Sequence, residues 1–365
     1  MPPSGAPYER KLVSPAFLTS THGQLGCTTC HAGQPETLDP KAAHRGLIAR
    51  PSAQPEAACG GCHGEITSRF TRSLHFTARG MENGLRALVG TVRWAQTRHA
   101  FRGACQSCHA TCGDCHVSRP PYRPQPPTVL GGVLDGHRFV KSPPTEVTCG
   151  GCHSGRVAAE FTGAYEGFPA DVHFTKAQMT CTSCHTAAQL HGDGSAPANR
   201  RAVRTKPSCL DCHPTAAPGA SRLRAHNIHG DKLACAVCHG GPVKSCFGCH
   251  AGEGATSRPT LKIGRNTDPN IKHVYTLMRH VPTTPDMIDR LTGLSGTLVN
   301  ADRVPTWKPA TPHTIQRVTA RSRTCDACHN NPNLFLRLGD LDPRGSQANG
   351  RVVTAPPRPL PPTTR

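Results

Sequence analysis

The chain is poor in the residues from which ordinary protein cores are built. Aromatic residues make up 4% and charged residues 18% of its 365 residues, whereas Gly (36) and Pro (35) are abundant. Gly and Pro interrupt helices and strands, and such a chain buries too little apolar surface to offset the entropy of ordering. The composition therefore argues against ordinary globular domains and predicts that something other than apolar side chains supplies the core.

Long hydrophobic runs are also missing. No segment approaches the roughly 18 consecutive apolar residues of a transmembrane helix, so we expect none. Residues 1–21, which we interpret as an N-terminal extension, lack the apolar segment of a secretory signal peptide.

Acidic residues are few relative to basic ones. The 42 Lys and Arg residues outnumber the 23 Asp and Glu residues, which gives a formal net charge of +19. Taken alone, this excess suggests nucleic acid or an anionic membrane surface as a partner. No basic motif interleaved with aromatic residues accompanies it, so we do not expect nucleic-acid binding.

Cysteine, in contrast, is abundant and follows one pattern. The unit Cys-x-x-Cys-His occurs ten times and uses all 20 cysteines. The cysteine pairs are Cys27 and Cys30, Cys59 and Cys62, Cys105 and Cys108, Cys112 and Cys115, Cys149 and Cys152, Cys181 and Cys184, Cys209 and Cys212, Cys235 and Cys238, Cys246 and Cys249, and Cys325 and Cys328. The histidines that complete the motifs are His31, His63, His109, His116, His153, His185, His213, His239, His250 and His329.

This unit is the attachment motif for c-type haem. Two cysteines three residues apart lie on one helical turn, where they form thioethers with the two vinyl groups, and the next residue ligates the iron. Zinc knuckles use Cys-x-x-Cys pairs without requiring His after each. We therefore expect ten covalent haems. Each ferric haem with its two propionates adds about −1, so we interpret much of the basic excess as neutralising propionates.

Twelve further histidines are available as second axial ligands. We expect nine or ten irons to be held between two imidazoles, since only five Met residues compete. The candidate distal ligands are His22, His44, His75, His99, His137, His173, His191, His226, His229, His280 and His313. His273 is the expected spare, because on a helix it would share a face with His280, seven residues away.

The motifs are unevenly spaced. Two residues separate the third motif from the fourth and six separate the eighth from the ninth, whereas 74 residues precede the tenth. The chain supplies one non-motif His per motif through the ninth. We expect a nine-haem region at 22–250, a region with the tenth haem at 251–354 and a Pro-rich tail at 355–365. Short helices are expected around Met81–Thr97 and Val274–Leu291.

With these motifs, residues 22–329 resemble the multihaem c-type cytochromes of respiring and metal-reducing microbes. The run SCHATCGDCHVSRP, followed by LDGHRFVK, is similar to uncharacterised multihaem cytochromes of environmental bacteria. The resemblance implies a mostly irregular fold of low secondary-structure content, with short α-helices packed around a haem chain. Haem is joined to such motifs outside the cytoplasmic membrane, so it also implies an exported protein, periplasmic or extracellular, whose leader lies outside this sequence.

Three functional readings remain open. Irons with two His ligands have no open position, which favours electron transfer between redox proteins or to extracellular acceptors. A multihaem reductase of nitrite, hydroxylamine or a sulfur oxyanion would need one open haem. A homopolymeric cytochrome filament is a form of the first reading, in which surplus His would ligate a haem in the adjacent subunit.

Overall fold

The computed structural model describes residues 13–104, 109–119, 132–133, 137–245, 260–284, 288–290, 293–296, 298–341 and 346–360. Cys105, Cys108, Cys246, Cys249 and His250 lie outside these residues, as do most of the N-terminal extension and the last residues of the Pro-rich tail.

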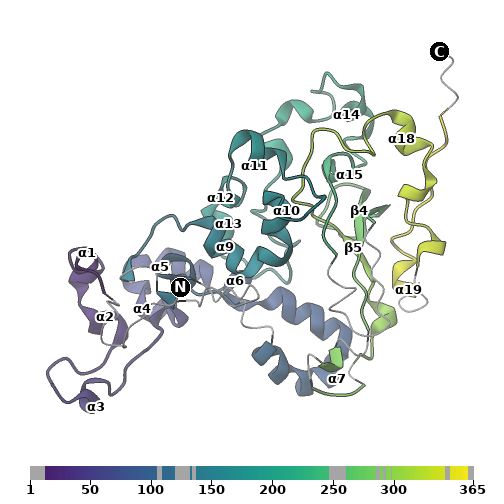
Figure 1. Cartoon of the computed structure of the whole chain (residues 1–365). Coiled ribbons are helices and arrows are strands. Elements are labelled where there is room, and N and C mark those ends of the chain that lie inside the picture. Colours follow the sequence, from purple (N-terminus) through teal and green to yellow (C-terminus); the bar gives the residue numbers. More distant parts are fainter. Residues whose placement is uncertain are drawn as a thin grey trace.

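Short helices joined by irregular segments make up most of the described chain, as the abundance of Gly and Pro predicts (Figure 1). The helices are α1 (Pro15–Leu18), α2 (Cys27–His31), α3 (Pro40–Ala43), α4 (Pro55–Ala58), α5 (Gly60–Phe70), α6 (Leu74–Thr77), α7 (Arg79–Ala104), α8 (Cys112–His116), α9 (Thr145–His153), α10 (Ala159–Thr162), α11 (Val172–Ala177), α12 (Cys181–Cys184), α13 (Ala187–His191), α14 (Arg224–His229), α15 (Cys235–His239), α18 (Cys325–His329) and α19 (Ser346–Asn349). A π-turn η6 (Ser154–Ala158) and a 3-10 turn η7 (Cys209–Asp211) belong to the same pattern.

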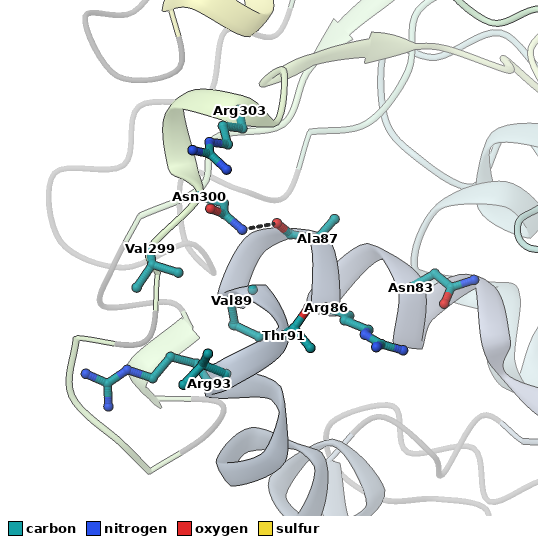
Figure 2. Close-up of a pocket in the computed structure, with 11 residues that line it drawn as sticks. Asn83, Arg86, Ala87, Val89, Thr91, Arg93, Val299, Asn300 and Arg303 are labelled. Carbon is teal, nitrogen blue, oxygen red and sulfur yellow. Dashed lines mark hydrogen bonds between the residues drawn. The ribbon is translucent and has the colours of Figure 1, made fainter.

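The helix expected around Met81–Thr97 is confirmed within α7, but it is broken in the middle. Gly90 adopts φ 72° and ψ 167°, a conformation that favours glycine. The break borders a surface hollow of about 860 Å³, shown in Figure 2, where the Asn300 side-chain amide donates to the Ala87 carbonyl at 3.1 Å. Arg86, Arg93 and other side chains line this hollow, and none of them belongs to a Cys-x-x-Cys-His motif.

A small antiparallel sheet organises the C-terminal part. Its strand order is β3 (Lys262–Arg265), β4 (Tyr275–His280), β5 (Trp307–Pro309), and a separate pair joins β1 (Ser118–Arg119) to β2 (Gly132–Val133). The helix expected over Val274–Leu291 is therefore wrong over β4. Leu277 and Met278 are both fully buried and pack into different apolar clusters. A central strand covered on both faces has no polar alternation, so its sequence resembles a buried helix.

This sheet has an apolar core of its own. One cluster contains Val237, Ile263 and Leu277, and the other contains Met278 and Trp307. Trp307 is fully buried and lies inside the protein. Val237 comes from before residue 251, which means that the expected division near that residue is not a break in the packing.

Several motif helices, in contrast, contribute nothing to protein-only packing, although Val237 of the motif helix α15 belongs to the core cluster. Helices α2, α12 and α18 and turn η7 bury no residue at all. Helices of three to five residues are marginal in water without tertiary support. Figure 1 shows α2 and α18 on opposite sides of the molecule, with α5, α9 and α12 between them. Among the described residues, no helix combines the length and hydrophobicity needed to cross a bilayer.

Candidate functional sites formed by paired histidines

Several motifs fold as capped helical turns. In four of them, the residue before the first cysteine is a Ser or Thr that acts as the N-cap: Thr111, Thr180, Ser208 and Thr324. A Ser or Thr oxygen satisfies free backbone N–H groups at the start of a helix, which fixes where the helix begins. Each turn therefore starts at the first cysteine and places the second cysteine and the histidine about one turn later.

Eight of the ten motif histidines each face one histidine from outside the motifs. The ring-centroid separations are 5.9 Å for His31–His137, 6.2 Å for His63–His22, 6.0 Å for His116–His191, 6.5 Å for His153–His75, 6.4 Å for His185–His313, 6.0 Å for His213–His173, 6.1 Å for His239–His226 and 6.0 Å for His329–His229. Among the described residues, every imidazole–imidazole contact joins one motif histidine to one other histidine, and no histidine is used twice.

This separation matches the space that one metal ion needs between two imidazoles. A metal–imidazole bond is about 2 Å long and each ring centroid lies about 1.1 Å behind its nitrogen, so two rings on opposite sides of one iron would have centroids about 6.2 Å apart. Direct ring stacking would bring the centroids closer, as in the 4.2 Å contact of His22 with Phe139. The residues present therefore fit a haem iron at each of the eight pairs.

The second ring nitrogen of many paired histidines is held by an acceptor. His31 donates from Nδ1 to the Ile48 carbonyl at 2.9 Å. His116 donates in the same way to the Val140 carbonyl at 2.6 Å, and His239 to the Gln316 carbonyl at 3.1 Å. Similar bonds hold His173, His185, His229 and His313 through Asp171, Gln189, Ala225 and Thr311. Such a bond fixes the tautomer and leaves Nε2 for the metal, which is the usual arrangement of metal-ligating histidines.

Burial also favours the neutral imidazole, which is the ligating form. Burial, followed by the charges of Arg156 and His185, lowers the pKa of His313 to about 4. Burial is likewise the main cause that lowers the pKa of His75 and of His153.

Most of the paired histidines are far apart in the sequence. The sequence places about one non-motif histidine before each motif, but that histidine rarely faces the motif that follows it. His22 precedes the first motif but faces the second, and His75 faces the fifth. His313 precedes the tenth motif but faces His185 of the sixth. His226 alone among the eight pairs faces the motif that directly follows it.

Four non-motif histidines make no ring contact with a described motif histidine. Three of them were expected as distal ligands, and the fourth, His273, was the expected spare. His280, expected as a distal ligand, lies in β4 with its ring 5.2 Å from the Trp307 ring, and its expected role stays a prediction because His250 of the ninth motif lies outside the described residues. The argument that paired it with His273 assumed a helix, whereas the segment is a strand. His44 and His99 are exposed, and no ring contact joins either of them to a described motif histidine.

His109 of the third motif has a different environment. Its closest aromatic neighbour is Phe76, at a centroid separation of 4.8 Å. Burial, then the charge of Arg50, lowers its pKa, while Asp114 opposes this. Among the described residues, no second imidazole ring contacts His109.

A cluster of cations lies beside the fifth and sixth motifs, and sequence analysis did not identify it. It consists of Arg156, Arg200, Arg201, Arg279 and Lys308. Arg279 and Lys308 are opposite one another on β4 and β5, where like charges are unfavourable. Burial, then Arg156 and Arg200, lowers the pKa of Arg279 to about 10, and burial with Arg279 lowers the pKa of Lys308.

Two carboxylates offset part of this charge. Glu160 pairs with Arg156 at 3.1 Å and Asp268 with Arg201 at 3.2 Å. These two ion pairs involve Arg156 and Arg201. A partly buried group of cations is suited to an anionic ligand, and carboxylates are strong partners for Arg.

Asp171 is a further residue that sequence analysis missed. Its Oδ1 accepts from Nδ1 of His173 at 2.8 Å, and its Oδ2 accepts from the Ile315 backbone N–H at 2.9 Å, two residues after His313. The spacing Asp-x-His in Asp171–His173 is a signal that could have identified it. This buried carboxylate thus connects the distal ligands of two motifs.

No group of three or more His, Cys, Asp or Glu side chains converges as a metal-binding cluster among the described residues. Searches of family models, curated proteins and solved structures find no match to this chain. The function is therefore inferred from the motifs and their geometry.

Proposed function

We propose that this protein transfers electrons through covalently attached c-type haems held between paired histidines. The proposal rests chiefly on one observation, that eight motif histidines each face one non-motif histidine at 5.9–6.5 Å. When bound, haem iron accepts and releases one electron at a time. The two imidazoles of each pair would hold the iron from both sides, so these eight sites would leave no position for a substrate to bind iron.

The other residues of the chain have defined tasks in this proposal. Two cysteines on each capped turn attach the porphyrin, and the Nδ1 acceptors orient the imidazoles. The cationic cluster beside the fifth and sixth motifs neutralises propionates. Haem surfaces cover the motif helices, which bury no residue against protein in α2, α12 and α18.

In this proposal the protein acts outside the cytoplasm, in the periplasm or at the cell surface. It passes electrons between redox partner proteins or to an extracellular acceptor. Growth into a homopolymeric filament is a variant of this function. His44 supports the filament variant. Its Nδ1 donates to the Pro40 carbonyl at 2.7 Å, as Nδ1 does in the paired histidines, and its ring is exposed at the surface, where a neighbouring molecule can reach it.

One observation favours a second candidate, a reductase of nitrite, hydroxylamine or a sulfur oxyanion. His109 is next to Phe76 rather than a second imidazole, so the third haem is the candidate for an open position. Binding of nitrite or hydroxylamine to one ferric haem per chain would support this reading, and a protein that binds neither would exclude it.

Intact mass spectrometry of the matured, exported protein tests the main proposal. The expected mass is that of the chain with ten haems. A matured protein with no covalent haem, or with zinc in its place, would contradict the proposal.

A further inference from the structure

The four residues 137–140 contact histidines of three different paired sites. His137 begins this segment and faces His31 of the first motif at 5.9 Å. Val140 ends it with two hydrogen bonds to His116 of the fourth motif. The Val140 N–H donates to the His116 carbonyl at 2.9 Å, and His116 Nδ1 donates to the Val140 carbonyl at 2.6 Å. Together these bonds hold both the backbone and the ring of His116.

Phe139, between the two ends of the segment, packs on a histidine of the second site. Its ring lies parallel to that of His22, with 4.2 Å between the centroids and 4° between the planes. His22 in turn faces His63 of the second motif, and the planes of these two imidazoles differ by 16°. A stacked aromatic ring resists rotation of its neighbour, so Phe139 holds the ring plane of His22.

The backbone of His137 is strained. Its φ is 70°, in the left-handed region that residues with a Cβ atom avoid. Such a conformation persists only where the surroundings determine it. Phe17 supplies part of these surroundings, because its ring lies 5.1 Å from that of His137 and stacks on Phe139 at 5.9 Å. The two hydrogen bonds of Val140 hold the other end of the segment.

The same arrangement recurs at residues 313–316. His313 begins this second segment and faces His185 of the sixth motif at 6.4 Å. Gln316 ends it three residues later, as Val140 does in the first segment. The Gln316 N–H donates to the His239 carbonyl at 2.8 Å, and His239 Nδ1 donates to the Gln316 carbonyl at 3.1 Å. Each segment thus provides the non-motif imidazole of one site and holds the motif histidine of another.

The middle of the second segment also contacts a third site. The Ile315 N–H donates to Asp171, whose other carboxylate oxygen accepts from His173 Nδ1. His173 faces His213 of the seventh motif at 6.0 Å. The two segments, HRFV and HTIQ, share only their first residue. Their common feature is therefore the contact with three sites, which a similarity of sequence does not explain.

We propose that residues 137–140 form a positioning segment for three haem sites, in which Phe139 sets the imidazole plane of the second site. This inference rests on the proposed function and adds residues that hold its ligands in place. The angle between the two imidazole planes sets the g-values of a low-spin ferric haem, and nearly parallel planes give the smallest maximum g-value. The planes differ by 52° at the first site and by 30° at the fourth.

Phe139→Ala tests the positioning role in the matured, full-length protein by electron paramagnetic resonance of the oxidised state. Phe139 is 38% exposed, so its loss should leave the fold intact. The second haem should stay low-spin because His22 remains, but the released ring can turn away from the plane of His63. The largest g-value of one haem in ten should therefore rise.

Two further variants make this result specific. Phe139→Tyr keeps the stacked ring and should retain the original spectrum. Phe168→Ala is the matched control, since the Phe168 ring packs on Tyr165 and Lys244. An unchanged spectrum in Phe139→Ala, or the same shift in Phe168→Ala, would overturn the role of Phe139 and leave the proposed electron transfer intact. Absence of any haem signal in the unaltered protein would overturn both.

An insertion tests the segment as a whole. One glycine added between Arg138 and Phe139 keeps every side chain but separates His137 from the contacts of Phe139 and Val140. The signals of three haems should change. The same insertion in the turn at 293–296, which contains no histidine, should change none. A change confined to one haem in the first variant would contradict a segment that positions three sites.

Discussion

Replacing His313 with alanine should open one specific haem, that of the sixth motif. His313 is the imidazole opposite His185, at 6.4 Å between ring centroids. The surrounding loop is anchored independently, because the Thr314 hydroxyl donates to the Pro242 carbonyl at 2.8 Å and the Ile315 N–H donates to Asp171. The variant should therefore fold and lose only the axial ligand.

The size of the effect follows from the stoichiometry. One of ten motifs loses a ligand, so about a tenth of the haem should change from low-spin to high-spin, and carbon monoxide binding to the reduced protein should increase by about one equivalent per chain. Added imidazole should restore the low-spin state, because it can occupy the position that the side chain vacates.

Two control variants separate this effect from general damage. His273→Ala should leave the spectrum unchanged, because no ring contact joins His273 to a described motif histidine. Trp307→Ala should lower thermal stability without creating a carbon monoxide site, because Trp307 is fully buried in the sheet. A carbon monoxide site in either control, with none in His313→Ala, would refute the assignment.

Three further predictions concern groups around the sites. Asp171→Asn should raise the reduction potential of the seventh haem, on the order of tens of millivolts, because His173 loses its carboxylate acceptor. Spectroelectrochemistry measures this potential, and an unchanged value would argue against a role of Asp171 in tuning the haem. Lys308→Met should lower the potentials of the fifth or sixth haem by a similar order, since a nearby positive charge favours the reduced form; a rise in both potentials would contradict propionate neutralisation by the cluster. Trp307→Ala should destabilise the C-terminal sheet by about 3–5 kcal/mol, because Trp307 is fully buried; denaturant unfolding checks this, and a loss under 1 kcal/mol would disagree with the packing.

The local arrangement of each motif could be predicted from sequence. A Cys-x-x-Cys-His unit places its three side chains on one turn wherever it occurs, so the proposed attachment residues follow from the motif alone. The partners could not be predicted, because the pairing of His22 with His63 or of His75 with His153 depends on tertiary folding. Counting histidines between motifs predicted one non-motif histidine per motif but gave no pairing.

The fold was predictable in its coarse form only. Abundant Gly and Pro indicated short helices and irregular connections, and α7 appeared where expected, with its break at Gly90. The strand β4 was mistaken for a helix because Leu277 and Met278 are buried on opposite faces of a covered sheet. The expectation that haem supplies the core stays a prediction for the motif helices, whereas the C-terminal sheet has its own apolar clusters.

The cationic cluster shows why the net charge of the chain could be interpreted from the sequence, whereas the position of the charged groups could not. The net charge of +19 indicated many anionic partners, yet Arg156, Arg200 and Lys308 are far apart in the sequence. Only the folded chain brings them beside the fifth and sixth motifs.

The spin state of the oxidised, matured protein tests the central claim most directly. If paired histidines hold the irons, quantitative electron paramagnetic resonance at low temperature should assign at least eight of the ten haems as low-spin with two imidazole ligands. A spectrum in which most of the iron is high-spin would contradict the account, because it would mean that the facing imidazoles do not ligate haem.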